Sequence, residues 1–189
     1  MRRLLFSLAL LLPLPLLAQS AATEEELNPA QIDLAALIEC RQQLNDFHYL
    51  APALLNPLQA VALGWRPLPQ ANLFMTEYKL NTPVTVFGHA TDHIAFTGDS
   101  IIAVLDLPDP RPLARQLALE TAIDTPAKAM FGKELVSEEE HDEASGITLI
   151  RSVVLNVSNV ASHPGKTLVG CCYSLDLAEE PEPADSATP

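Results

Sequence analysis

The chain has 189 residues, of which 48% are hydrophobic and 19% are charged, and its formal net charge at pH 7 is −13. The hydrophobic content excludes a fully disordered protein, because such chains lack the apolar residues that build a core. The acidity excludes a typical nucleic-acid binder, since phosphates are bound by basic surfaces. The chain has only three cysteines, which excludes a small disulfide-dense scaffold.

Residues 1–22 have the organisation of a secretory signal peptide. Two arginines follow Met1, an almost wholly apolar run extends from Leu4 to Leu17, and small residues at 18–22 follow it. This order is typical of a cleaved export signal. The alternative is an uncleaved anchor, but the run is shorter than the about 20 residues that span a bilayer. We expect cleavage and a periplasmic or secreted product without a membrane span.

The rest of the chain is predicted to form an α+β protein in two halves, residues 23–107 and 108–177. Each half begins with apolar residues at helical spacing and continues with β-branched and aromatic runs between turn residues. This pattern is typical of antiparallel sheet packed by helices. Residues 178–189 are acidic and rich in proline without a large apolar residue, so we predict a disordered tail.

The first half is predicted to contain two helices and a meander. Apolar residues recur every three or four positions from Asp33 to Leu44, which predicts the first helix. Pro57 and Gly64 bracket a short second helix, because proline favours the first turn and glycine the end. Alternating and β-branched runs between Phe74 and Leu105 predict antiparallel strands, with Gly98-Asp99 as a two-residue hairpin turn.

The second half repeats this order of elements. Asp109–Pro112 opens a helix, Asp124–Phe131 predicts a second short helix, and strand-like runs end at Leu175–Leu177 as the first set ends at Leu105–Leu107. The pattern indicates a tandem duplication, and the alternative is a single α+β domain with halves alike by chance. The layout resembles the tandem helix-loop-helix-and-sheet arrangement of bacterial β-lactamase inhibitory proteins. The resemblance is one of element order, so it implies no target or activity.

Export would allow the cysteines to form a disulfide. Cys40 is predicted on the first helix near its apolar stripe, while Cys171 and Cys172 are adjacent in the last strand and point to opposite faces. Cys171 shares the more apolar face with Val169 and Tyr173, which a helix is expected to cover. We therefore predict a Cys40–Cys171 disulfide. The alternatives are Cys40–Cys172, a bridge between the adjacent cysteines, or three free thiols.

The densest group of metal-ligand residues is His89, Asp92 and His93, which are candidate ligands. They could converge across a turn, since imidazole and carboxylate groups are common metal ligands. No Glu follows His89, so the helical zinc-protease motif is absent. The alternative is a polar turn between strands. The acidic run 138–143 lacks the spacing of a calcium loop and is predicted to be a solvated strand end and turn.

One stretch could contact a partner. Trp65 and Arg66 lie in an apolar segment stiffened by prolines, and these residue types are favoured at protein interfaces. The alternative is that Trp65 covers the end of the core.

The sequence contains no recognised catalytic motif. It has no G-x-S-x-G elbow, no G-x-G-x-x-G motif and no phosphate-binding Gly-Lys-Ser/Thr loop, and we predict no bound cofactor. These observations favour an exported, non-catalytic binding protein, such as an inhibitor or envelope accessory protein, with a protein partner in the envelope or outside the cell. The alternative is a metal-dependent envelope enzyme or a metal-binding protein that uses His89, Asp92 and His93.

Overall fold

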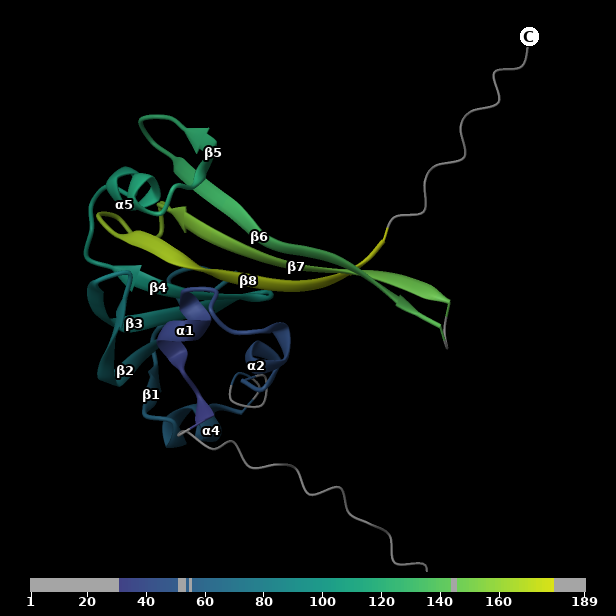
Figure 1. The fold of residues 1–189 in the computed structure, drawn as a ribbon. Coiled ribbons are helices and arrows are strands. Elements are labelled where there is room, and N and C mark those ends of the chain that lie inside the picture. The colour runs from purple at the N-terminus through teal and green to yellow at the C-terminus, as the bar shows by residue number, and fades with distance from the viewer. Residues whose placement is uncertain (1–30, 51–53, 55, 144–145, 179–189) are drawn as a thin grey trace, which may run out of the picture.

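A computed structural model of the protein describes residues 31–50, 54, 56–143 and 146–178 (Figure 1). The predicted signal peptide, and the predicted tail apart from Ala178, lie outside these residues. The described chain forms one eight-stranded antiparallel sheet with short helices packed against it, which confirms the predicted α+β class.

The described helices are α1 (Leu34–Ile38), α2 (Leu44–His48), α4 (Pro57–Ala62) and α5 (Arg111–Gln116). The strands are β1 (Trp65–Pro67), β2 (Thr76–Val86), β3 (His89–Thr97), β4 (Ser100–Leu105), β5 (Glu120–Asp124), β6 (Ala129–Asp142), β7 (Ile147–Ser158) and β8 (Thr167–Leu177).

The strand order across the sheet is β1-β2-β3-β4-β8-β7-β6-β5. Each predicted half therefore contributes four strands to a single sheet, and the halves meet where β4 pairs antiparallel with β8. In Figure 1 the paired strands β6 and β7 extend well beyond the helices. The strand order alone does not establish a duplication, which stays a prediction.

The second short helix predicted at Asp124–Phe131 is wrong, because this segment forms the β5–β6 hairpin. The backbone N–H of Thr125 donates to the carbonyl oxygen of Lys128 at 2.9 Å, and the Thr125 hydroxyl oxygen accepts from the Lys128 N–H at 3.0 Å. These bonds close a tight turn. Phe131 is then paired on both sides, with Thr121 of β5 and Val157 of β7, and this pairing outweighs the weak helix signal.

The first predicted helix, Asp33 to Leu44, is in fact two helices with a break between them. Asp33 caps α1 by accepting a hydrogen bond from the Ala36 N–H at 2.9 Å. α1 ends at Ile38, and Cys40 takes a left-handed backbone conformation with φ of 56°. Cys40 therefore lies in the turn after the helix and not on the helix. Other local predictions are confirmed, including Pro57 at the start of α4 and Gly98-Asp99 as the β3–β4 turn.

The main core lies between the helices and one face of the sheet. Tyr173 of β8 is fully buried there, stacks on Phe47 of α2 with ring centroids 5.3 Å apart, and donates its hydroxyl proton to the Leu37 carbonyl oxygen at 2.8 Å. Burial raises the pKa of Tyr173 to about 12. The hydroxyl thus stays protonated and holds α1 to the sheet.

The predicted disulfide joins the same helices to the same strand. Cys40 and Cys171 are bonded, with their Cα atoms 5.2 Å apart and a sequence separation of 131. Cys172 is a free, partly exposed cysteine on the opposite face of β8. The face alternation that distinguished the two neighbouring cysteines in the sequence is therefore confirmed.

The opposite face of the sheet carries a second, smaller apolar cluster, formed by Met75, Ala95, Val104 and Leu168. The connection between β7 and β8, residues 159–166, lies over this face, and its Val160 packs against the cluster. Ser162 of the same connection accepts a hydrogen bond from the Asn72 side chain at 3.2 Å, which ties it to the segment before β2. This covered part of the second face holds the candidate site.

The join between β4 and β8 requires glycine at position 170. A Cβ atom there would lie 2.1 Å from the Ile101 carbonyl oxygen and 2.8 Å from the Ile102 Cα. Gly170→Ala is therefore expected to lower the free energy of unfolding by about 2–3 kcal/mol, because backbone atoms of the neighbouring strand cannot rotate away. Urea denaturation measures the effect. Gly132→Ala is the control, since the nearest atom to its Cβ would be in the Asn156 side chain, at 3.0 Å, and the nearest backbone atom would be the Leu155 carbonyl oxygen, at an ordinary contact distance of 3.6 Å. Equal losses for the two variants would contradict this account.

Candidate metal centre

Three segments bring Glu77, His93 and His163 together. Glu77 and Lys79 lie on the same face of β2 because side chains alternate along a strand. Lys79 pairs with His93 of β3, so the imidazole of His93 lies on that face as well. His163 belongs to the β7–β8 connection and reaches the same point from above the second apolar cluster.

The three side chains meet at one carboxylate oxygen. Oε2 of Glu77 is 2.8 Å from Nε2 of His93 and 2.9 Å from Nε2 of His163. One ligand atom from each residue lies within 4.8 Å of the others, and in the described part of the chain no other group of three His, Cys, Asp or Glu residues does so. The side chains of Glu77 and His163 are 3% and 6% exposed, and that of His93 is 25% exposed.

The other oxygen of the same carboxylate is not satisfied. Oε1 of Glu77 is buried and has no hydrogen-bond partner among the described residues. An unpaired buried polar atom is unfavourable and is uncommon in native proteins. The carboxylate therefore has the capacity for one further strong interaction within the site.

Outer hydrogen bonds hold the His163 ring and the backbone of His93 in place. Nδ1 of His163 lies 3.0 Å from Oγ of Ser162, the hydroxyl group that also accepts from Asn72. On the other side, the backbone N–H of His93 donates to Oγ1 of Thr91 at 3.1 Å, and Thr91 donates to the Val104 carbonyl oxygen at 2.7 Å. A contact of the kind that His163 makes fixes ring orientation in metal sites and raises the cost of disturbing them.

The electrostatics of the site favour an ionised carboxylate. Burial alone would raise the pKa of Glu77, but hydrogen bonds from His163 and His93 outweigh it and lower the pKa below its ordinary value. A carboxylate and two neutral imidazoles form a ligand set that suits zinc and copper ions. The three residues could hold such an ion if both Nε2 atoms were deprotonated.

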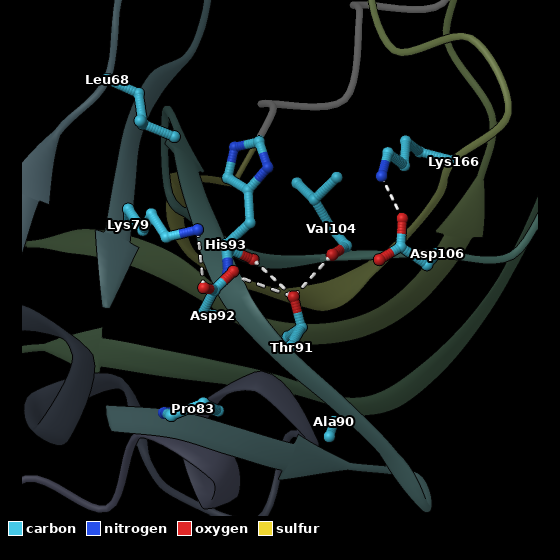
Figure 2. Close-up of a pocket in the computed structure, with 10 residues that line it drawn as sticks. All are labelled: Leu68, Lys79, Pro83, Ala90, Thr91, Asp92, His93, Val104, Asp106 and Lys166. Carbon is cyan, nitrogen blue, oxygen red and sulfur yellow. Dashed lines mark hydrogen bonds and ion pairs between the residues drawn. The ribbon is translucent and has the colours of Figure 1, made fainter. Parts of the chain in front are cut away.

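A groove with a volume of about 500 Å³ adjoins the site on the side of His93. It forms where the pairing of β2 and β3 is interrupted between the pairs Lys79↔His93 and Val84↔Thr91. Figure 2 shows the His93 ring between two ion pairs. Lys79 and Asp92 lie on one side of it, and Lys166 and Asp106 lie on the other. Neither Glu77 nor His163 lines the groove.

Of the three ligands predicted from the sequence, the structure brings only His93 into this cluster. Asp92 contacts Lys79 instead, with 2.8 Å between Oδ2 and Nζ, and the hydrogen bond from Lys79 lowers the pKa of Asp92. His89 pairs with Val86 beside the β2–β3 turn.

Sequence reasoning missed Glu77 and His163. Glu77 alternates with apolar residues as an outward-facing acid would, and His163 lies in a turn 86 residues further along the chain. To place Glu77 and His163 together, one would have had to predict that the β7–β8 connection folds over the sheet.

The other singled-out residues lie elsewhere. Trp65 is 5% exposed and packs against Tyr78 and Phe96 in the main core, whereas Arg66 is exposed. Their role as partner contacts stays a prediction. The glutamates of the run 138–143 are exposed at the end of β6 and in the turn after it, as expected, and Arg151 pairs with Glu138 and Glu140.

Comparisons with protein families, with curated proteins and with solved structures found no match to this chain. None of the helices in the described ranges is long and apolar enough to cross a membrane.

Proposed function

We propose that this chain is an exported metal-binding protein that holds one divalent transition-metal ion, such as zinc, with Glu77, His93 and His163. The observation that carries the proposal is a buried carboxylate with two imidazole Nε2 atoms within 2.9 Å of one oxygen and, among the described residues, no partner for the other. The proposal takes up the alternative of a metal-binding protein that the sequence left open, but with Glu77 and His163 in place of His89 and Asp92.

The alternative for these residues is a hydrogen-bonded cluster that only stabilises the fold. That arrangement would place two donors on Oε2 and leave Oε1 of Glu77 buried with no partner in the part of the chain that the structure describes. A metal ion accounts for both features, because it replaces the two imidazole protons and lets either or both carboxylate oxygens coordinate. The unpartnered oxygen therefore favours the metal-binding interpretation.

Zinc titration of the chelator-treated protein tests the proposal. We expect one zinc ion per chain by elemental analysis after desalting, and a melting temperature that rises with zinc concentration, because a ligand bound to the folded state stabilises that state. Zinc content well below one per chain, together with an unchanged melting temperature, would leave only the hydrogen-bonded cluster. Magnesium provides the control ion, since it prefers oxygen ligands.

Export to the periplasm or the medium is part of the proposal. The predicted signal peptide at 1–22 motivates it, and the Cys40–Cys171 disulfide supports it, because such bonds persist in oxidising compartments. Binding of a metal ion outside the cytosol would also place the site where metal ions arrive from the environment.

A further inference from the structure

A small molecule could reach a bound metal ion through the groove beside His93. Glu77 and His163 are almost completely buried, so they shield the ion from their own side. His93 is the most accessible of the three ligands, with 25% of its side chain exposed, and the one that lines the groove. If Glu77 coordinates through one oxygen, the three protein ligands would leave a zinc ion one free coordination position, and His93 is the one of these ligands that lies beside the groove.

The walls of the groove carry both signs of charge on both sides. Lys79 pairs with Asp92 on the side of β2 and β3, and Lys166 pairs with Asp106 where β4 ends and β8 begins (Figure 2). All four side chains are more than a third exposed. Ion pairs of this kind contribute little to stability, so their members can exchange partners readily.

This charge pattern favours one class of ligand. A simple anion would be repelled by the net charge of −13 and would leave the two aspartates uncompensated. A simple cation would leave the two lysines uncompensated. A zwitterion can give its carboxylate to a lysine and its ammonium group to an aspartate, so that every charge keeps a partner.

The size of the groove agrees with a small ligand. Its volume of about 500 Å³ falls within the range of small-molecule sites. Apolar residues also line the groove, namely Leu68, Pro83, Ala90 and Val104, which suits a short aliphatic side chain.

We propose that this groove binds a small zwitterion, an α-amino acid or a dipeptide, whose ammonium group pairs with an aspartate of the groove. One oxygen of its carboxylate would accept from a lysine, and the other oxygen would occupy the free position of the metal ion. The proposal rests on the proposed metal-binding function. It adds the class of ligand and makes Lys79 and Lys166 binding residues, although neither contributes a metal ligand.

Calorimetric titration of the zinc-loaded protein with L-alanine tests the proposal, with propionate and ethylamine as probes that each carry only one of the two charges. We expect L-alanine to bind the zinc-loaded protein at least tenfold more tightly than the zinc-free protein, and more tightly than either single-charge probe. Lys79→Met and Lys166→Met should each weaken alanine binding at least fivefold without changing zinc content. Lys128→Met, in the exposed β5–β6 turn, is the matched control and should change neither alanine binding nor zinc content.

The outcomes separate the two proposals because zinc content is measured in every sample. Retained zinc without alanine binding, equally tight binding of propionate, or release of zinc to alanine would each overturn the groove proposal alone. Failure of the protein to take up zinc would overturn the metal-binding function on which it rests.

Discussion

Removal of the Cys40–Cys171 disulfide is expected to lower the free energy of unfolding by about 4–5 kcal/mol. The bond closes a loop between residues 131 positions apart, and a crosslink over so long a loop strongly restricts the unfolded chain. It also joins the turn between α1 and α2 to the strand on which those helices pack. Urea unfolding of the oxidised protein and of the Cys40→Ala/Cys171→Ala double variant measures the difference.

The third cysteine provides the control for this experiment. Cys172 is unbonded and faces the other side of β8, so Cys172→Ala should leave the oxidised protein nearly as stable as the parent. It also prevents exchange between the free thiol and the disulfide during unfolding. A loss of less than about 1 kcal/mol in the double variant would show that packing of α1 and α2 suffices without the crosslink.

The sequence predicted features that depend on neighbouring residues. The α4 helix followed from Pro57 and Gly64, and the β3–β4 hairpin from Gly98-Asp99. The choice of Cys171 over Cys172 as the partner of Cys40 followed from strand alternation and the apolar character of one face. In each case a local pattern favoured the structure that forms, although for the cysteines it left other pairings open.

Prediction failed where tertiary pairing overrode a weak local signal. The segment Asp124–Phe131 carries a cap and a proline that suit a helix, yet its residues pair with two neighbouring strands. The break after Ile38 has a similar origin, because the chain turns at Cys40 to place a second helix on the core. Neither event can be read from apolar spacing within a single segment.

The candidate site could not be predicted because it depends on topology. His93 stood out through its neighbours in sequence, but its actual partners come from β2 and from the β7–β8 connection. β8 lies beside β4, which brings the connection preceding β8 to the face that carries His93. Proximity in sequence suggested His89 and Asp92 as the partners of His93, whereas the strand order of the sheet places Glu77 and His163 beside it.

The ligand set from the structure (Glu77, His93 and His163) and the set predicted from the sequence (His89, Asp92 and His93) make opposite predictions for the zinc affinity of single variants. His163→Ala is expected to weaken zinc binding more than 100-fold, because outer-shell changes alone cost 10- to 100-fold and a lost ligand costs more. Glu77→Gln is the second variant, since it retains the side-chain shape while removing the charge that holds the ion. Competition with a chromogenic zinc chelator measures the affinities, and urea unfolding of the zinc-free variants shows whether each has folded.

The controls are His89→Ala and Asp92→Asn, which change the sequence-predicted ligands outside the cluster. Both should bind zinc within about threefold of the parent protein, because Asp92 contacts Lys79 and His89 lies beside the β2–β3 turn. If these variants lost affinity while His163→Ala kept it, the ion would be held at the turn, and the Glu77 cluster would serve the fold alone. If His163→Ala and Glu77→Gln lost affinity together, the buried carboxylate with its two imidazoles would be the metal site.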